Sequence, residues 1–333
     1  MIGPPTVPPP AHALLSVFPM AEPSQAAAPP PSLIVSVLIV TYNCAPALRR
    51  CIESVERTQQ RESVEILVVD NGSADDCGRI DSEFPGVTVL RLPKNFGLTK
   101  ARNIGTRTAK GEYLLLLEPD VELLPDTIPA LAAHLAADNE AVAVCPLLVS
   151  PDFEPVFRTR SLPTTESLAQ ACRDGGLAGE AAGDLGRATI PIEYPEPGAM
   201  LVRRRFIQGM NYFDQHYGQH WSDADLCARI RGSGKTILLM TGTRAVRRAE
   251  GLWEPADSDA RAALDADLAL GAAAYVGKHF GMAAGLRFRL RLILSAVGEA
   301  LAGLVTFRET GYRFGRLTRI LKGQKVDGFQ QGL

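Results

Sequence analysis

Long apolar runs alternate with amphipathic segments through the first half of the chain. Apolar runs of strand length lie at 32–40, 64–70, 87–93, 112–117 and 141–149. Between them, apolar residues at helical spacing cover 45–60, 97–111 and 125–138. Strands that are apolar throughout, separated by amphipathic helices, are typical of a mainly parallel sheet with helices on both faces. The pattern therefore predicts an α/β fold, whose ligands would bind beyond the carboxyl ends of the strands.

The second half of the chain departs from this rhythm. Residues 150–190 are rich in Pro, Gly and Ala, which predicts a long loop. Regular structure is expected to resume with a strand in 198–207, a helix from about Ser222 and a strand at 235–240. We expect three parts in the whole chain. They are a disordered Pro/Ala-rich tail at 1–31, a domain at 32–256 that is large enough to be a catalytic domain, and a C-terminal helical extension at 257–333. The domain at 32–256 is expected to have two halves, 32–150 and 151–256.

Composition narrows the function classes. The chain has 333 residues and a formal charge of −2, so it lacks the basic surplus that nucleic-acid binding requires. Its six cysteines are scattered and form no C-x-x-C pair, which indicates a reducing compartment rather than a disulfide framework. Because the N-terminus also has no secretion-signal pattern, we predict a cytoplasmic location.

The segment "LLLLEPDVEL" at 114–123 ends an apolar run on a cluster of acids. Two carboxylates about 4 Å apart cost roughly 4 kcal/mol at an effective dielectric near 20, unless a cation or proton relieves them. Either the acids are the solvated exit of a buried strand, or they hold a metal or a substrate there. Asp70 also ends a predicted strand, so it is expected to lie along the same edge as Glu118 and Asp120.

The segment after the first strand tests two nucleotide-binding classes. A dinucleotide-binding domain needs a glycine-rich turn there, and a sugar nucleotidyltransferase needs a glycine-rich loop bearing lysine or arginine. The segment "TYNCAPAL" has no glycine, which argues against both. A nucleotide-binding sheet without this loop must neutralise a diphosphate with a divalent cation on carboxylates or with arginines.

Six segments in register resemble glycosyltransferase family 2, whose members have the GT-A fold. The segments are "SVLIVTYN" (36–43), "ILVVDNGSADD" (66–76), "NFGLTKARNIG" (95–105), "LLLLEPDVEL" (114–123), "GAMLVRRRFI" (198–207) and "FDQHYGQHWSDADLCARIRGSG" (213–234). The x-P-D motif and the D-x-D-L-C helix are most similar to rhamnosyltransferases and related enzymes of polysaccharide assembly. The resemblance implies a GT-A nucleotide-diphospho-sugar transferase fold and an inverting transfer of a sugar to a hydroxyl group.

The resemblance also implies roles for the strand-end residues. Thr41 and Tyr42 would line the nucleotide base and ribose, Asp70 would accept a hydrogen bond from the pyrimidine, and Arg102 would help to hold the nucleotide. Nucleoside-diphosphate sugars linked to dTDP or UDP are the implied donors, and 32–150 would be the nucleotide-binding half. The acceptor half at 151–256 would bind a lipid-linked acceptor or a saccharide.

The family's acidic motif and its catalytic base fall on three residues of this chain. Asp120, with Glu118, matches the position that binds Mg²⁺ or Mn²⁺, and Asp223 matches the general base. Such a cation would allow the acids at 118–122 to lie close together. From the residues alone, Ser222 and Asp225 also fit a capping box, which would make Asp223 only a first-turn acid of a helix.

Three positions depart from the family pattern. Glu118 stands where the acidic motif usually starts with Asn or Asp, and Ser222 stands where a glutamate commonly precedes the base. Arg248 occupies the place of a histidine that can bind the metal, and a guanidinium cannot do so. The hypothesis is that Arg247 or Arg248 contacts the diphosphate instead. A catalytically degenerate sugar-nucleotide-binding protein is the alternative that this departure leaves open.

Residues 285–309 place Arg287, Arg289 and Arg291 before an apolar stretch that is shorter than a membrane span. This pattern suits an interfacial helix on the inner face of the cell membrane, where it would bring the enzyme near a lipid-linked acceptor. A helix packed on the catalytic domain or on the second subunit of a homodimer fits it equally well.

Overall fold

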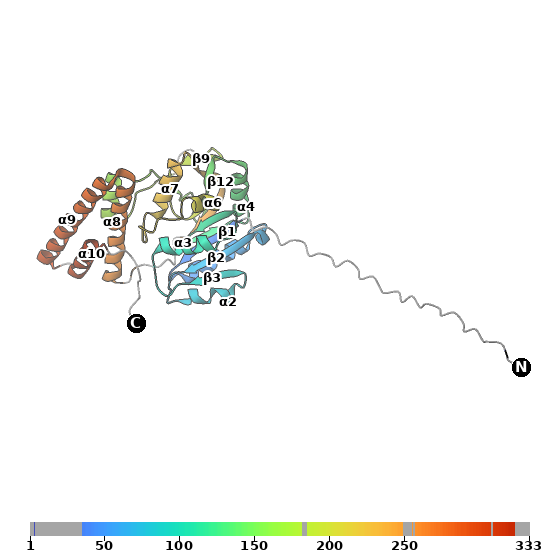
Figure 1. Cartoon of the computed structure of the whole chain (residues 1–333), viewed down its shortest axis with the longest axis horizontal. Coiled ribbons are helices and arrows are strands. Elements are labelled where there is room, and N and C mark those ends of the chain that lie inside the picture. The colour runs from blue at the N-terminus through green and yellow to red at the C-terminus, as the bar shows by residue number, and fades with distance from the viewer. Residues whose placement is uncertain are drawn as a thin grey trace. The chain divides into compact units, whose positions relative to one another are not determined.

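The computed structural model describes residue 3 and residues 35–181, 185–248, 255, 257–307 and 309–323. Contacts divide the chain into Met1–Pro31 and Ser32–Leu333. The predicted tail at 1–31 lies, apart from residue 3, outside the described residues. The features below all belong to the second unit (Figure 1).

In the described part of the chain, nine strands form the central sheet. They are β1 (Val35–Thr41), β2 (Val64–Asp70), β3 (Val87–Arg91), β4 (Tyr113–Leu117), β5 (Val121–Leu123), β6 (Ala141–Val149), β9 (Thr189–Ile192), β11 (Ala199–Arg203) and β12 (Thr236–Arg247). Their order is β3-β2-β1-β4-β11-β6-β12-β5, and β9 pairs with β12. β11 runs antiparallel between β4 and β6, whereas β3, β2, β1 and β4 are parallel. The predicted strands of the first half are therefore confirmed, and the antiparallel insertion of β11 is an addition.

Strand register brings the predicted site segments to one edge. Thr41 at the end of β1 pairs with Asp70 at the end of β2, and Ile39 of β1 pairs with Leu117 of β4. The acids that follow Leu117 consequently leave the sheet beside the end of β1. Parallel strands share a carboxyl edge, so the buried apolar strands carry the polar residues to a common place.

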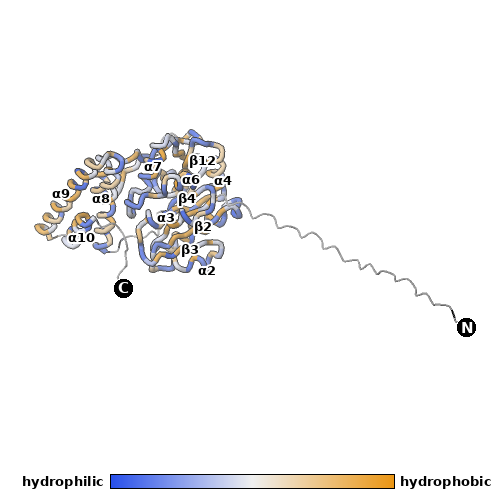
Figure 2. The backbone as a smooth tube through the Cα atoms, viewed as in Figure 1, coloured by the Kyte–Doolittle hydropathy of each residue, from blue (hydrophilic) through white to orange (hydrophobic). Residues whose placement is uncertain are grey.

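The helices pack against this sheet and against one another. They are α1 (Ala45–Glu56), α2 (Ile80–Glu83), α3 (Leu98–Thr108), α4 (Thr127–Ala137), α5 (Thr165–Asp174), α6 (Arg204–Gly209), α7 (Ser222–Gly232), α8 (Ser258–Phe280), α9 (Met282–Thr306) and α10 (Thr310–Lys322). Apolar side chains from the strands and from α1, α4 and α7 form one continuous core, and the hydropathy of the strands follows this burial (Figure 2).

The predicted loop at 150–190 is wrong in its central part. Thr164 and Ser167 exchange side-chain and backbone hydrogen bonds in a capping box, and this starts helix α5. Three short strands, β7 (Arg158–Arg160), β8 (Glu180–Ala181) and β10 (Tyr194–Pro195), form a small second sheet. The strands are too short for a periodic pattern, and the surrounding Gly and Pro residues concealed the ten-residue helix α5. The strand expected in 198–207 also ends early, since α6 begins at Arg204.

Helices α8, α9 and α10 pack on one another. Their contact surfaces are apolar: Ala266 and Ala269 of α8, Ala296 of α9 and Ile320 of α10 form a separate buried cluster. Among the described residues, no helix has the length and apolarity needed to cross a membrane.

Gly111 tests the packing that fixes the register of β1 and β4. A Cβ atom there would lie 2.6 Å from the Ser36 amide nitrogen and 2.8 Å from the Val35 carbonyl carbon, both backbone atoms of β1. Gly111→Ala should therefore lower the free energy of unfolding by about 1–3 kcal/mol, measured by urea denaturation. Gly298→Ala is the control, because a Cβ in the middle of α9 meets nothing within 4 Å. An unchanged midpoint for Gly111→Ala would contradict this account.

Candidate active site

Two adjoining cavities lie beyond the carboxyl ends of β1 and β4. The first, of about 270 Å³, is lined by Thr41, Tyr42 and Asn71 among others. The second, also of about 270 Å³, is lined by residues from α3, β7, β10, α7, β12 and α8 and from connecting segments. Its polar lining includes Arg102, Asp120, Arg160, Tyr194, Asp223 and Arg247. Glu118 lines both cavities, so the two form a continuous polar surface.

Polar side chains that line the first cavity are held by contacts with one another and with their neighbours. The buried Thr41 hydroxyl lies 3.1 Å from the Cys44 sulfur, and Asn71 donates from its side chain to Asn95 Oδ1 at 2.9 Å. Burial raises the pKa of Tyr42, so its hydroxyl stays protonated at neutral pH. Thr41 and Tyr42 thus lie together in a cavity that offers hydroxyl and amide groups to a ligand.

Asp70 is at the predicted sheet edge but lines neither cavity. Its Oδ1 accepts a hydrogen bond of 2.9 Å from the Ser73 amide, which holds the turn after β2. The adjacent Asn71 lines the first cavity instead. A contact between Asp70 and a nucleotide base stays a prediction.

Arg102 and Glu118 form a partly buried ion pair at the junction of the cavities. The guanidinium Nη2 lies 2.7 Å from Glu118 Oε1, and the Arg102 side chain is 8% exposed. Burial raises the pKa of Glu118, while the positive charge of Arg102 opposes this rise. Helix α3 thereby places a fixed cation beside the acidic segment that follows β4.

Asp120 is buried and only half satisfied. Its Oδ2 accepts from Arg247 Nε at 2.9 Å, whereas its Oδ1 has no hydrogen-bond partner in the described part of the chain. A buried carboxylate oxygen without a partner costs free energy, and a hard cation is a fitting ligand for it. Among the described residues, no group of three or more His, Cys, Asp or Glu could hold a metal. A cation here would therefore depend on Asp120, Glu118 and oxygens from a ligand.

The two neighbouring arginines at the end of β12 lie in different places. Arg247 lines the second cavity, and its Nη1 donates to the Pro197 carbonyl at 2.9 Å. Arg248 lines neither cavity, and its Nε donates to Glu122 Oε1 at 2.6 Å. Alternation along an extended strand sends successive side chains to opposite faces, which separates the pair.

Asp223, near the start of α7, lines the second cavity. Its Oδ2 accepts from the Tyr194 hydroxyl at 3.0 Å, and its Oδ1 accepts from the Ala224 amide at 2.9 Å. Burial and the negative charge of Asp223 raise the pKa of Tyr194 well above its usual value, so the phenol remains a donor. Sequence reasoning missed Tyr194; its aromatic ring in a Pro-rich segment was the one available signal.

The capping-box interpretation of this helix start is wrong. The residue before α7 is Trp221, whose φ of 74° lies in the left-handed region, and it makes no side-chain cap. The Ser222 hydroxyl is buried without a hydrogen-bond partner in the described residues. Asp225 does not reach back to the helix start but belongs to a different cluster.

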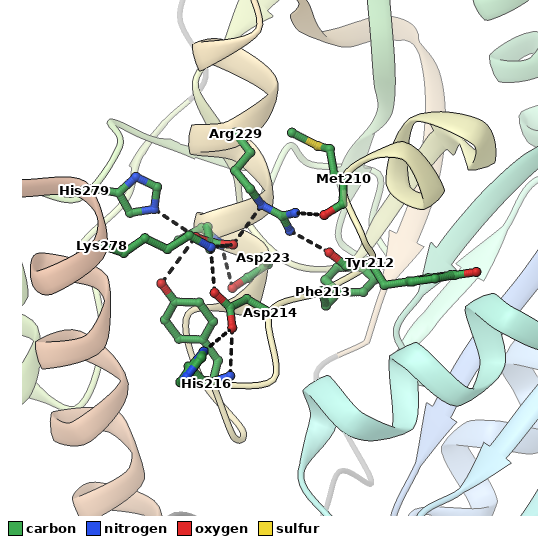
Figure 3. A network of polar contacts seen from close by, with 12 residues as sticks. Met210, Tyr212, Phe213, Asp214, His216, Asp223, Arg229, Lys278 and His279 are labelled. Atoms are coloured by element: carbon green, nitrogen blue, oxygen red, sulfur yellow. Dashed lines mark hydrogen bonds and ion pairs between the residues drawn. The ribbon is translucent and has the colours of Figure 1, made fainter.

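Asp225 is the centre of a buried ionic network that joins α7 to α8. Figure 3 shows three of its partners, Arg229, Lys278 and His279. The Asp225 carboxylate lies 2.9 Å from Arg229 Nε, 2.8 Å from Lys278 Nζ and 2.9 Å from His279 Nε2. Lys278 also contacts Asp214 at 2.7 Å. Burial alone would raise the pKa of Asp225, but the hydrogen bonds from His279 and Lys278 and the charge of Arg229 outweigh burial and lower it.

Helix α8 also holds the segment that leads into Asp223. The buried Asp267 carboxylate accepts from the Gln219 amide at 2.8 Å and from the His220 amide at 3.2 Å. The Trp221 indole donates to the Leu268 carbonyl at 2.8 Å. Gln219, His220 and Trp221 line the second cavity, so residues of the helical part fix one of its walls.

Comparisons with known proteins bear on the fold of the chain and on its sequence family. The model of "Glycosyl transferase family 2" matches residues 36–183. A crystal structure of GalNAc-T7 with UDP, GalNAc and Mn²⁺ has a TM-score of 0.54 at 18% identity, covering 70% of this chain and 47% of that chain. The fold is thus that of a GT-A glycosyltransferase. Residues 36–183 of the chain are similar to members of glycosyltransferase family 2.

Two curated relatives show how far the similarity extends. Glycosyltransferase GlyG of Streptococcus pneumoniae is 34% identical over 117 residues, which are 34% of this chain and 38% of that protein. The matched part is therefore well under half of that relative. An N-acetylglucosaminyl-diphospho-decaprenol L-rhamnosyltransferase of Mycobacterium tuberculosis is 24% identical over 220 residues, covering 60% of this chain and 71% of that protein.

Asp225→Asn tests the network between α7 and α8. Removing one partner of a buried ion pair should destabilise the protein by about 3–5 kcal/mol at pH 7, because charges of Arg229 and Lys278 lose their partner. The folded-state pKa of Asp225 is depressed, so its stabilisation is present above the unfolded value of about 3.9 and is lost as pH falls below it. The difference in free energy of unfolding between wild type and variant, measured by urea denaturation, should persist from pH 7 to pH 5 and narrow near pH 3.

Glu83→Gln is the matched control for this measurement. Glu83 forms an exposed ion pair with Arg49 at 2.6 Å, and exposed pairs contribute little. Its denaturation midpoint should remain close to that of wild type. Equal effects of the two substitutions would contradict a special role for the buried network.

Proposed function

We propose that the protein is an inverting glycosyltransferase that moves a sugar from a nucleoside diphosphate to a hydroxyl acceptor, in the assembly of a cell-surface polysaccharide or glycolipid. The observation that carries the proposal is the shared lining of the second cavity. A carboxylate fit to act as base, Asp223, faces the same space as Asp120, Arg102 and Arg247. An acceptor hydroxyl and a diphosphate leaving group require opposite kinds of partner, and this cavity holds both.

The first cavity would bind the nucleoside. The hydroxyl groups of Thr41 and Tyr42 and the amide of Asn71 line it, and they suit the ribose and the polar edge of a pyrimidine. Glu118 marks the passage to the second cavity, where the diphosphate would lie. The donor would be linked to dTDP or UDP.

A divalent cation, Mg²⁺ or Mn²⁺, fits the acidic residues after β4. Asp120 would bind it through the Oδ1 atom that no protein group satisfies in the described residues, and Glu118 would add a second carboxylate. Mg²⁺ is commonly held by one or two carboxylates together with substrate phosphates, so a third protein ligand is not required. The cation supplies positive charge that neutralises the diphosphate.

Two arginines of the protein, Arg247 and Arg102, would also neutralise the charge of the diphosphate. Arg247 holds Asp120 through Nε and faces the cavity, so its guanidinium can also donate to phosphate oxygens. Arg102 contributes a second fixed charge through its pair with Glu118. These groups stabilise the negative charge that grows on the leaving diphosphate without reorganising during the reaction.

Asp223 would act as the general base. It accepts the proton of the acceptor hydroxyl while that oxygen forms a bond to the anomeric carbon, and the bond from the same carbon to the diphosphate oxygen breaks. The displacement occurs in one step and inverts the configuration at the anomeric carbon. Tyr194 donates to Asp223 Oδ2 and so orients the carboxylate, leaving its second oxygen toward the Ala224 amide and the cavity.

The similarity to a rhamnosyltransferase of Mycobacterium tuberculosis supports a deoxysugar donor and a lipid-linked or saccharide acceptor. The small sheet of β7, β8 and β10 would contribute to acceptor choice, because Arg160 and Tyr194 of this sheet line the second cavity. The guanidinium carbon of Arg160 lies 5.6 Å from the centre of the Tyr194 ring.

Asp223→Asn should reduce the turnover number for transfer by about 10²–10⁴, since the amide cannot accept the proton. Affinity for UDP or dTDP, measured by calorimetry, should stay unchanged. Asp259→Asn is the matched control, because Asp259 is a first-turn acid of α8 with no place in either cavity. Full activity in Asp223→Asn would reject the base, and absence of transfer and donor hydrolysis in wild type with dTDP-, UDP- and GDP-sugars would favour a degenerate binding protein.

Arg247→Ala and Arg248→Ala test how the diphosphate is held. Loss of a charge-assisted hydrogen bond, about 1.5–3 kcal/mol, should weaken UDP or dTDP binding by Arg247→Ala about tenfold or more. Arg248→Ala should bind within about twofold of wild type, because Arg248 contacts Glu122 outside the cavities. Both are measured by calorimetry with Mn²⁺ and with excess chelator. Equal weakening by the two substitutions would contradict the division of roles.

A further inference from the structure

Helix α9 carries a continuous exposed apolar face. Five large apolar side chains, Leu286, Leu290, Leu294, Leu301 and Val305, are each 55–80% exposed. Their spacings of four, four, seven and four residues place them on one side of the helix. The face runs over most of the 25-residue helix, which is about 37 Å long.

The opposite side of α9 is already used for packing. Phe288, Ala296, Ala300 and Gly303 are buried, and α9 contacts both α8 and α10. The exposed leucines are therefore not an unfinished part of the protein core. Monomeric soluble proteins rarely expose a contiguous apolar surface of this size, and such surfaces mark sites of interaction.

Basic residues accompany this face. Arg287 and Arg291 are exposed on α9, and at helical spacing they border the leucines on one side. Residues 282–323 contain eight lysines and arginines but only two glutamates, whereas the whole chain has a formal charge of −2. The two glutamates are themselves paired: Glu299 contacts Arg316, and Glu309 contacts Arg261 at 2.7 Å. The exposed charged residues that border the apolar face, Arg287 and Arg291, are thus both positive.

We propose that the exposed face of α9 binds the surface of an anionic lipid bilayer, with the leucines in the headgroup–acyl boundary and the arginines against lipid phosphates. An apolar helix face bordered by arginines is the pattern of an interfacial helix. An interfacial helix of this kind lies along the surface of the bilayer. This proposal does not depend on the reaction proposed above.

A second copy of the chain is the competing occupant of this face. In a two-fold interface the same surface of each subunit meets its counterpart. That arrangement would bring the basic segments of two copies together, at a cost in repulsion, because the glutamates of each segment are already paired. An anionic surface instead gains about 1 kcal/mol from each nearby lysine or arginine. Charge complementarity therefore favours the bilayer.

Flotation of the full chain with lipid vesicles tests the proposal. The protein should float with vesicles of phosphatidylcholine and phosphatidylglycerol and much less with phosphatidylcholine alone, and added salt should reduce binding. Leu290→Glu with Leu294→Glu should lower the partition coefficient at least about tenfold, as should Arg287→Gln with Arg291→Gln. Val156→Glu is the control, because this exposed residue lies outside α9 and should bind as wild type.

Sedimentation of the same proteins decides between the two occupants. These side chains are exposed, so the variants should keep the wild-type circular dichroism and denaturation midpoint. A wild-type chain that fails to float with anionic vesicles would overturn the proposal. So would a dimer that the paired Leu290→Glu and Leu294→Glu substitutions convert to monomers, since the face would then be a subunit contact. Normal nucleotide binding by each variant separates any loss of flotation from a failure of the active site.

Discussion

The balance of charge around Asp120 is the constraint on which the active site depends. The sheet delivers this carboxylate to a buried position in the wall of the second cavity, and a single guanidinium, that of Arg247, satisfies one of its oxygens. An uncompensated ion in such a place would be too costly to retain for stability alone. The other oxygen, Oδ1, has no hydrogen-bond partner in the described residues. The proposed cation, bound together with the donor diphosphate, would be its ligand.

The sheet half of the fold could be predicted from the sequence because its strands are apolar throughout. Residues 64–70 and 141–149 became strands at those bounds, since a fully buried strand leaves an uninterrupted run. The carboxyl ends of β1 and β4 then brought Thr41 and Glu118 together, as parallel pairing requires. Local pattern was sufficient wherever burial on both sides of the sheet dictated the residue type.

Contacts between distant segments could not be predicted in the same way. Tyr194 meets Asp223 only because the small second sheet folds over the cavity, and two-residue strands leave no periodic trace. Asp225 looked like a capping residue because Ser222 precedes it at the right spacing, yet the left-handed Trp221 redirects the chain and α8 supplies the partners. Arg247 and Arg248 are adjacent basic residues, and the sequence alone did not show which of them lines a cavity. Alternation along the strand directs Arg247 to the second cavity and Arg248 to Glu122.

Gly271 of α8 allows the C-terminal helices to pack closely against Trp221, in the segment that leads into Asp223. A methyl group at this position would meet the Trp221 ring at 2.6 Å, so the helix backbone itself forms the seat of the indole. A graft that joined the sheet of this protein to foreign helices would have to reproduce this seat, or the segment carrying the base would shift. Helices could therefore be exchanged between related proteins only together with the segment that contains the partner of Gly271, Trp221.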